Sequence, residues 1–410
     1  MSPHHPTPPA LKTVAPHIQA LLDSDLGPDL SRLLCGLRQG HVVGPPEVRG
    51  LLDPGALEGA LSWSQAAEPA ARPGPTFILA GSFVEEEEIR RLYQARGEPT
   101  VGLFSSIVPA AAARRAAGTL STGDVEGPTR REAVERRYAL LSTARVGSGY
   151  LCGLLKEAGL GLPAEHVRTA TLPALQAGMP VERFLDAMEP YAARNGVFGT
   201  KLPLGMFAKA CGGRADQLMQ ASEALQRRGY AHFRLTRNPI DCAVSWGLAI
   251  ATRFWHVGSA SAEEARKAQQ DAAPDDADLI AFIYARVAQD VMAERILPAP
   301  AATFSYEQLD EDGAEVVRTI ASALSRPAAP SAKASQLPVK LSADNPSYLR
   351  WRRRACELVQ QQQKTALPRA VTYAVELTGL PVRELRRWPE FEANLQALAA
   401  AAAQGLAASA

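Results

Sequence analysis

The chain has 410 residues, 46% of them hydrophobic, and a formal net charge of +1 at pH 7, so it can build one large core or two modest ones. A charge this small gives no general attraction to nucleic acid, so any basic site must be local. No apolar run approaches the length of a membrane span, and the N-terminal Met-Ser-Pro-His-His-Pro lacks the basic and apolar regions of a signal peptide, so we expect a cytoplasmic protein.

The first third of the chain predicts a small α/β unit. The leucine spacing from about residue 17 to residue 70 predicts short helices. Thr76–Ala80 and Thr100–Phe104 then predict two strands around a helix from Val84 to Arg96, which together form a βαβ unit.

An acidic run, Glu85–Glu88, opens that helix. Negative charge is favourable near a helix N-terminus, so we expect the run to stabilise the helix start and otherwise to form a solvated face rather than a metal site. The polar, glycine-containing stretch from Gly118 to Arg131 predicts a linker.

The next informative segment, Tyr138–Lys156, predicts a buried strand, a loop of small residues and an amphipathic helix. The apolar run ends at Thr143, and leucines then recur at helical spacing. Gly147 and Gly149 can themselves adopt φ values that other residues rarely have. Backbone N–H groups at the helix start offer an anion site. The residues around it are Arg145, Ser148 and Gly149.

A second strand and helix meet near Arg237. The predicted strand runs from Ala231 to Thr236, and Pro239 fixes φ at the first turn of the following helix. Ser245 would face the same side as the arginine. A guanidinium and a hydroxyl that converge beside a helix start can hold one phosphate group. Two anion sites on one parallel sheet indicate a ligand with two phosphate-like ends.

These two segments resemble motifs of the sulfotransferases that use 3′-phosphoadenosine 5′-phosphosulfate (PAPS), within the bacterial trehalose 2-sulfotransferase and Nod-factor sulfotransferase branch. Thr143–Gly149 is similar to the 5′-phosphosulfate loop, and Arg237–Trp246 is similar to the 3′-phosphate motif, the more specific match. The resemblance covers roughly residues 136 to 355. Further similar segments, in the family's order, are Pro163–His166, Gly196–Lys201, Ala251–Trp255, Ser305–Leu309 and, loosely, Lys340–Arg353.

The resemblance implies an α/β fold: a three-layer, P-loop-like sulfotransferase domain with a mostly parallel sheet, preceded by a smaller N-terminal α/β extension of unknown role. The expected divisions are 1–130 for the extension, with 1–16 loose, 131–355 for the sulfotransferase-like domain, 356–399 for C-terminal helices, and 400–410 for an Ala-rich tail that frays.

The implied activity is transfer of a sulfuryl group from PAPS to a hydroxyl of a carbohydrate, glycolipid or natural product, with the bisphosphate PAP as product. Expected partners are the small-molecule or glycolipid acceptor, with a homodimer as an option for assembly and no nucleic acid. The residues implied to bind the cofactor are Arg145, Val146, Gly147, Ser148, Gly149 and Tyr150 at the loop, and Arg237, Ser245 and Lys340 at the 3′-phosphate.

Three further residues are candidates for the chemistry. Glu165 matches the position of the carboxylate proposed as general base in the trehalose branch. His166 is its rival, because an imidazole titrates near ~6.5 without tuning. Lys201 corresponds to a lysine near the active site. One departure is Gly149, which stands where the family usually has a hydroxyl residue.

Two other classes of protein stay open. Gly147–Gly153 gives a G-x-G-x-x-x-G pattern after a strand, and Glu165 follows at about the position of the acidic residue that binds a ribose. This pattern is typical of a Rossmann-like enzyme that uses NAD or S-adenosylmethionine. A sulfotransferase-like binding protein without turnover is the other. The sequence has no G-x-x-x-x-G-K-[S/T] loop, no nucleophile elbow at Ser148, no H-E-x-x-H and no C-x-x-C, so no metal is expected. Its five scattered cysteines predict no disulfide framework.

Overall fold

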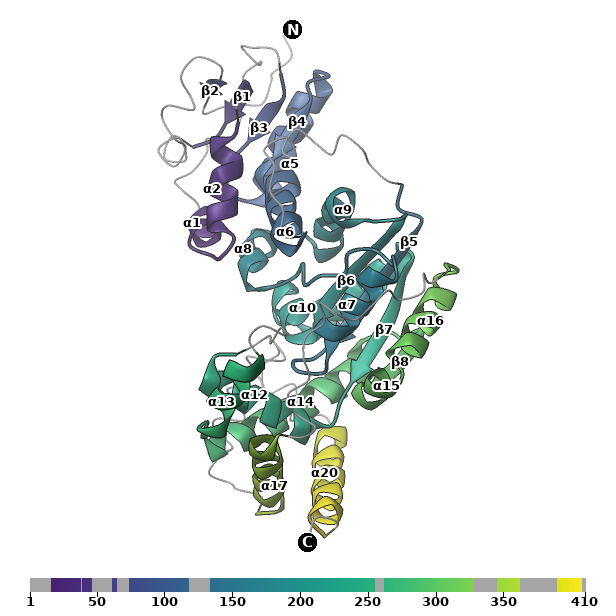
Figure 1. Cartoon of the computed structure of the whole chain (residues 1–410). Helices are drawn as coiled ribbons and strands as arrows, with labels where there is room; N and C mark the ends of the chain where they lie inside the picture. Colours follow the sequence, from purple (N-terminus) through teal and green to yellow (C-terminus); the bar gives the residue numbers. More distant parts are fainter. Residues whose placement is uncertain are drawn as a thin grey trace. The chain divides into compact units, whose positions relative to one another are not determined.

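The computed structural model describes residues 16–37, 39–45, 61–64, 74–117, 133–254, 262–327, 345–361 and 389–407 (Figure 1). The chain divides into two compact units. Unit 1 comprises Met1–Ala133 and His166–Ala193, and unit 2 comprises Val134–Glu165 and Arg194–Ala410. Residues 166–193 thus belong to unit 1, although they lie within the range expected for the second domain.

Unit 1 contains a parallel four-stranded sheet in the order β2-β1-β3-β4. The predicted βαβ unit is confirmed as β3, α5 and β4, and the predicted short helices are present as α1 and α2. The elements are α1 (Pro16–Leu22), α2 (Gly27–Cys35), β1 (Gly40–Val43), β2 (Leu61–Ser64), β3 (Thr76–Ile78), α5 (Phe83–Ala95) and β4 (Thr100–Gly102).

The strands β1 and β2 were not predicted, because only helices were expected between residues 17 and 70. All four residues of β1 are buried. A strand that is buried on both faces has no alternation of polar and apolar residues, and a run of four is too short to be distinguished from a piece of helix.

The π-helix η1 (Leu103–Ile107) and α6 (Val108–Ala117) follow β4, so the strand predicted to reach Phe104 ends at Gly102. Glu86 binds the backbone of η1 just after the end of β4. Its side chain is fully buried and accepts hydrogen bonds from the backbone N–H groups of Phe104 at 2.6 Å and Ser105 at 3.0 Å. The expected solvated face of the acidic run is therefore wrong at Glu86. Burial raises the pKa of this carboxyl to about 7.

The rest of unit 1 comes from the returning segment. It holds η3 (Thr169–Thr171), α8 (Leu172–Gln176) and α9 (Val181–Ala192). Within unit 1, α9 packs on α6 and α8 packs on α1. The buried face of α9 includes Phe184, Leu185 and Met188, each 0% exposed, so this helix depends on contacts made by residues before 118.

Unit 2 contains a second parallel sheet with four strands, in the order β6-β5-β7-β8. In each sheet the strand that comes first in the chain, β1 or β5, lies between the next two strands. The expected α/β architecture with parallel sheets is confirmed. In sheets of this kind, ligands bind outside the carboxyl ends of the strands, where the strand order reverses. In unit 2 that place lies between β5 and β7. The strands are β5 (Arg136–Ser142), β6 (Val197–Pro203), β7 (Tyr230–Thr236) and β8 (Ala302–Ser305).

Helices connect these strands and complete unit 2. The described helices are α7 (Ser148–Glu157), α10 (Leu204–Ala210), α11 (Ala215–Arg227), α12 (Pro239–Thr252), α13 (Ala262–Gln270), α14 (Asp276–Ile296), α15 (Tyr306–Glu311), α16 (Gly313–Ala323), α17 (Pro346–Gln361) and α20 (Pro389–Ala407). The Ala-rich end remains helical as far as Ala407. Alanine has the highest helix propensity, and α20 also packs against α14 and α17.

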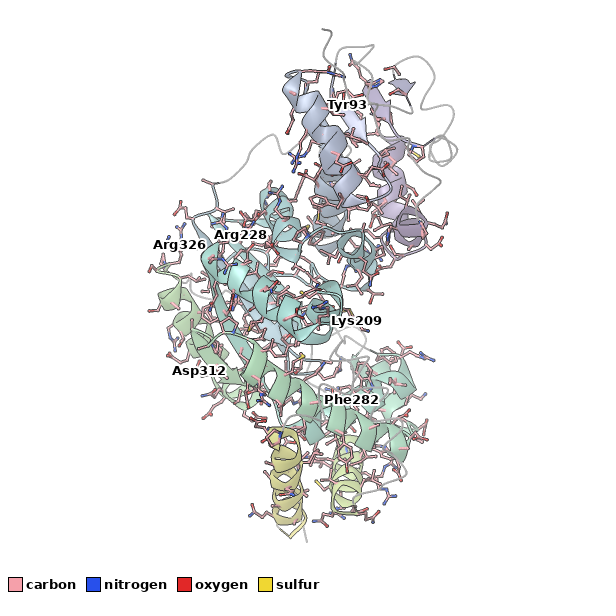
Figure 2. The ribbon with its side chains drawn as sticks, turned by 180° about the vertical axis from the view of Figure 1, so that it is seen from behind. Tyr93, Lys209, Arg228, Phe282, Asp312 and Arg326 are labelled. Atoms are coloured by element: carbon pink, nitrogen blue, oxygen red, sulfur yellow. The ribbon has the colours of Figure 1, made fainter. Side chains whose placement is uncertain are left out.

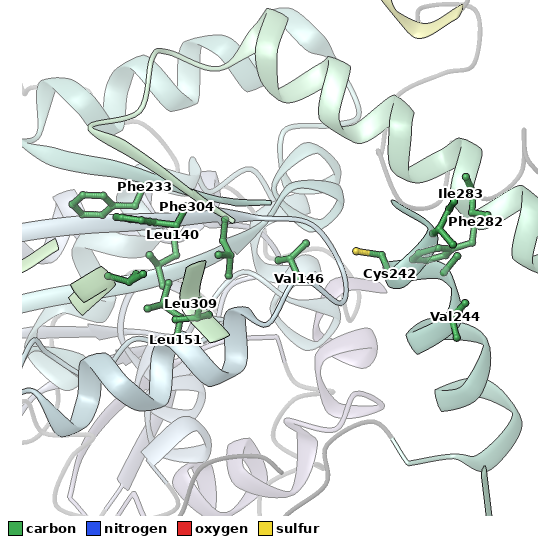
Figure 3. Packing of buried hydrophobic residues seen from close by; sticks show 14 of the residues in the cluster. Leu140, Val146, Leu151, Phe233, Cys242, Val244, Phe282, Ile283, Phe304 and Leu309 are labelled. Carbon is green, nitrogen blue, oxygen red and sulfur yellow. The ribbon is translucent and has the colours of Figure 1, made fainter. Parts of the chain in front are cut away.

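One hydrophobic cluster joins the sheet of unit 2 to its helices. Figure 3 shows part of it, with side chains from three strands, the loop after β5 and helices α7, α12, α14 and α15. The residues labelled there are Leu140, Val146, Leu151, Phe233, Cys242, Val244, Phe282, Ile283, Phe304 and Leu309. Because Val146 of the loop and Cys242 of α12 are both 0% exposed, the core holds the loop and the start of α12 in place.

Two polar residues labelled in Figure 2 hold the ends of α16. The carboxylate of Asp312 caps its start by accepting a hydrogen bond from the N–H of Glu315 at 2.9 Å. Arg326, after its end, forms an ion pair with Glu135, just before β5. The end of α16 is thereby tied to the beginning of β5.

His232 of β7 gives the folded state a pH dependence. Its side chain is 2% exposed, and neither ring nitrogen has a hydrogen-bond partner among the described residues. Burial lowers the pKa of the imidazole from 6.5 to about 4. The stability that the neutral ring contributes is therefore present above pH ~6.5 and is lost as the pH falls towards 4.

We expect His232→Phe to raise the free energy of unfolding of unit 2 by about 2 kcal/mol more at pH 5 than at pH 8, because phenylalanine cannot take up the proton. Urea unfolding of both proteins at the two pH values measures the difference. An equal effect of the substitution at pH 5 and pH 8 would show that His232 does not cause the acid sensitivity.

Candidate functional site

The loop between β5 and α7 turns the chain sharply. Arg145 has a left-handed backbone with φ 66°, and Gly147, the N-cap residue of α7, has φ 84°. A Cβ atom on Gly147 would lie 2.6 Å from a ring carbon of Tyr306. Glycine is therefore required at 147 both for its conformation and for its lack of a side chain. No side chain caps α7, which leaves its first N–H groups for a ligand.

The predicted loop residues differ in which of their atoms a ligand could contact. Val146 is fully buried in the core, so only its backbone can contact a ligand. Ser148 is 8% exposed, Tyr150 packs partly buried against the core, and Gly149 is exposed. A Cβ on Gly149 would meet no atom within 4 Å.

The two glycines of this loop should respond in opposite ways to substitution. We expect Gly149→Thr to fold normally and to raise the affinity for PAP about twofold to tenfold, because the open position accepts a hydroxyl that can donate one more hydrogen bond. We expect Gly147→Ala to lower both stability and PAP affinity, because of its positive φ and the ring of Tyr306. Thermal unfolding and calorimetric titration of both variants test this. A loss of stability in Gly149→Thr comparable with that in Gly147→Ala would contradict it.

The second predicted element, β7 followed by α12, forms as expected. The strand ends at Thr236, the Asn238 side chain accepts a hydrogen bond from the N–H of Ile240 at 2.9 Å, and Pro239 occupies the first turn. The sequence Arg-Asn-Pro thus places Arg237 in the short connection between a strand end and a capped helix start.

The structure brings three of the predicted cofactor-binding residues together. The Nε of Arg145 donates a hydrogen bond to the Oγ of Ser245 at 3.0 Å, and the Nη1 of Arg237 donates to the main-chain carbonyl of Arg145 at 3.1 Å. The loop after β5 and the connection after β7 therefore meet at one place. Arg145 was expected at the 5′-phosphosulfate, and its guanidinium here contacts Ser245, the residue expected at the 3′-phosphate.

Two positive charges lie close to each other at this place. Burial and the neighbouring charge of Arg237 both lower the pKa of Arg145. The guanidinium of Arg237 stacks on the ring of Tyr306, 4.0 Å from its centre, and its Nε is buried without a hydrogen-bond partner among the described residues. A buried donor left unpaired costs about 1–3 kcal/mol. An anion is the kind of ligand that such a pair of arginines would bind.

Side chains from α17 complete the surroundings of Arg237. Its Nη2 donates to the hydroxyl of Tyr348 at 3.3 Å, and that hydroxyl donates to the Oδ1 of Asp241 at 3.0 Å. The same oxygen of Asp241 accepts a hydrogen bond from the Nε of Arg352 at 2.8 Å.

Sequence reasoning did not identify Tyr306, Tyr348, Asp241 or Arg352 as members of the site. Asp241 lies inside the motif that holds Arg237, and Tyr306 lies inside a segment similar to the sulfotransferases, so for these two a signal was present. Tyr348 and Arg352 lie inside the loosely similar segment Lys340–Arg353 and, being four residues apart, share one face of a helix. No local pattern shows that this face meets α12.

Glu165 and Lys201 form a separate pair in unit 2. The Nζ of Lys201 lies 2.6 Å from the Oε2 of Glu165. A short parallel bridge brings them together, in which the N–H of Lys201 donates to the carbonyl of Ala164 at 2.8 Å. The side chain of Lys201 is 16% exposed and that of Glu165 is 35% exposed, so the carboxylate is accessible from solvent.

The thiol of Cys152 lies close enough to Lys201 and Glu165 for both charges to affect its pKa. Burial raises the pKa of Cys152 on α7 to about 11, while the charge of Lys201 lowers it and that of Glu165 raises it. Cys152 comes one turn after the start of α7, so the Glu165–Lys201 pair lies near the helix that begins at the glycine loop.

The two remaining predicted residues are His166 and Lys340. His166 belongs to unit 1 and is 1% exposed. Burial and the charge of Arg168 lower the pKa of its imidazole to about 3, so it is a weak base in this structure. Lys340 falls outside the described residues.

The described residues contain no group of three or more His, Cys, Asp or Glu that could hold a metal ion. All five cysteines are free thiols. Among the helices that the structure describes, none combines the length and apolar character needed to cross a membrane.

No protein-family model matches the chain, and no curated protein sequence matches it. Among solved structures, the chain is similar to the crystal structure of a sulfotransferase from Alicyclobacillus acidocaldarius. The identity is 14%, the alignment covers 62% of this chain and 100% of the other, and the TM-score is 0.29. A likeness of this size carries no weight for function, which has to be judged from the side chains described above.

Proposed function

We propose that unit 2 is a sulfotransferase that moves a sulfuryl group from PAPS to a hydroxyl of a carbohydrate, glycolipid or natural product. The observation that carries this proposal is the meeting of Arg145, Arg237 and Ser245 at the carboxyl ends of β5 and β7. In the two segments that resemble sulfotransferase motifs, the guanidinium of Arg145 bonds the hydroxyl of Ser245, and the guanidinium of Arg237 bonds the main-chain carbonyl of Arg145. This arrangement suits a phosphate group better than the diol of a ribose.

The residues present fit a donor with two anionic ends. The uncapped start of α7, with the N–H groups of Ser148 and Gly149, would hold the 5′-phosphosulfate. Arg237 and Ser245 would hold the 3′-phosphate, and Arg145, which reaches Ser245 here, would serve that end as well. A phosphate oxygen that reached the Nε of Arg237 would satisfy a donor that has no partner among the described residues.

The pair of Glu165 and Lys201 would supply the chemistry. In the transfer, the bond between sulfur and the bridging oxygen of the donor breaks, a bond between sulfur and the acceptor oxygen forms, and the acceptor proton moves to the carboxylate of Glu165. Lys201 aligns this carboxylate through their 2.6 Å ion pair. Its positive charge would also stabilise the negative charge that develops on the bridging oxygen. Glu165 is preferred to His166 because its carboxylate is accessible and the imidazole is buried with a low pKa.

Calorimetric titration of the whole protein with PAP tests the proposal, with NAD and S-adenosylmethionine as parallel controls. We expect saturable binding of PAP and no binding of either control. A heat signal from a control without one from PAP would identify a Rossmann-like site. If PAP binds, incubation with radiolabelled PAPS and a panel of sugar, glycolipid and natural-product alcohols shows whether label is transferred, and binding without any transfer would favour a catalytically silent protein.

A further inference from the structure

A series of hydrogen bonds connects α17 to the arginine of the proposed 3′-phosphate site. Arg237 donates to Tyr348, Tyr348 donates to Asp241, and Arg352 donates to the same oxygen of Asp241, over distances of 3.3, 3.0 and 2.8 Å. Tyr348 is 7% exposed, so its hydroxyl has little access to water. Both ends of the series are arginines, and the carboxylate lies between Tyr348 and Arg352.

The guanidinium of Arg237 is fixed on three sides. Its Nη1 is held by the carbonyl of Arg145, its Nη2 by the hydroxyl of Tyr348, and its face by the ring of Tyr306. The carbonyl holds one nitrogen and the ring holds one face, so the Tyr348 hydroxyl is the contact that fixes the second terminal nitrogen in the plane of the group. An arginine that recognises phosphate through its planar donors depends on that orientation.

The phenol also separates Asp241 from Arg237. A carboxylate bonded directly to Arg237 would neutralise the positive charge that attracts a phosphate. The neutral hydroxyl of Tyr348 instead fixes the orientation of the guanidinium and leaves its positive charge in place. Burial and the charge of Asp241 raise the pKa of Tyr348 well above its usual range, which keeps the phenol neutral. Arg352 forms an ion pair with Asp241, whose side chain is 17% exposed, and so compensates its negative charge.

We propose that Tyr348 is a positioning residue that orients Arg237 and thereby sets the preference of this site for a nucleotide with a 3′-phosphate over the same nucleotide without one. The inference rests on the proposed function, since it takes the site of Arg237 to be the 3′-phosphate site. It adds a role for α17, a helix more than one hundred residues from the Arg237 motif.

The test compares the affinities of two ligands that differ only in the 3′-phosphate, PAP and adenosine 5′-monophosphate. We expect Tyr348→Phe, which removes the hydroxyl and keeps the ring, to lower PAP affinity about fivefold to tenfold, in the range of one ordinary hydrogen bond. The affinity for adenosine 5′-monophosphate should not change. Leu349→Ala, at the neighbouring and 54% exposed position, is the control and should change neither affinity.

The outcomes separate this inference from the proposed function. Lack of PAP binding by the wild-type protein would overturn both. Wild-type binding of PAP with an equal loss of both affinities in Tyr348→Phe would overturn only the inference, because a general structural role lowers both. In the Arg237→Ala background, Tyr348→Phe should have no further effect on PAP affinity, and an undiminished effect there would also contradict the inference. If Tyr348→Phe does not fold, Tyr348→Leu permits the same comparison.

Discussion

The substitution Glu165→Gln is expected to lower kcat for sulfuryl transfer by about 10²- to 10⁴-fold, the range for loss of a general base, while PAP affinity stays the same. Glutamine has the same size as glutamate but cannot accept the acceptor proton. The side-chain oxygen of glutamine can still accept a hydrogen bond from Lys201, whose side chain is 16% exposed, so the variant should stay folded. Steady-state transfer rates with PAPS and calorimetric titration with PAP, made on the same preparations, measure the two effects separately.

Glu223→Gln is the matched control for this experiment. Glu223 is a half-exposed glutamate of α11 that forms an ion pair with Arg227 at 3.7 Å, so its substitution makes the same chemical change away from the proposed site. Its transfer rate should equal that of the wild-type protein. Full activity of Glu165→Gln would remove Glu165 from the mechanism. His166 would then be tested next, although its pKa of about 3 makes it a weak base.

The substitution Arg237→Ala is expected to weaken PAP binding by about 2–4 kcal/mol, the range for loss of a charge-assisted partner of a phosphate. This corresponds to a loss of affinity of about 30- to 1,000-fold. The variant should remain folded, because the substitution removes both a buried unpaired Nε and a charge that lowers the pKa of Arg145. Calorimetric titration gives the affinity and thermal unfolding gives the stability.

Arg234→Ala tests whether the effect of Arg237→Ala comes from local contacts or from net charge. Arg234 lies three residues earlier on β7, and its side chain pairs with Asp290 at 3.3 Å and with Glu294 at 3.6 Å. The control changes the net charge equally but leaves the proposed phosphate site intact, so PAP affinity should be nearly unchanged. Unchanged affinity in a folded Arg237→Ala protein would show that Arg237 does not bind the 3′-phosphate.

The parts of unit 2 that were predicted correctly carry local signals. The strand, glycine loop and helix from β5 to α7, and the Asn-Pro start of α12, are encoded within a few neighbouring residues, and they place Arg145, Arg237 and Ser245 at one edge of the sheet. Such signals act through backbone preferences of single residues. They are therefore readable without knowing what lies beside them in the fold.

The parts that were missed depend on contacts between distant residues. Tyr348 reaches Arg237 across 111 positions, and no spacing rule connects them. Glu86 is a charged residue in an acidic run, and its hydrogen bonds to the N–H groups and the Ser105 side chain of η1 explain why it is buried. The strand β1 is hidden for the opposite reason, since complete burial removes the alternation by which strands are recognised.

The assignment of residues 166–193 to unit 1 determines the order in which the protein can complete its folding during synthesis. The apolar face of α9 finds its partner α6 in sequence made earlier, while β5 and α7 of unit 2 emerge in between. Unit 1 therefore cannot finish folding before residue 193 has left the ribosome, when most of unit 2, from Arg194 to Ala410, is still unmade. A shortened protein that began at β5 would carry α9 with Phe184 and Met188 uncovered, so the N-terminal unit cannot be deleted as if it were a separate module.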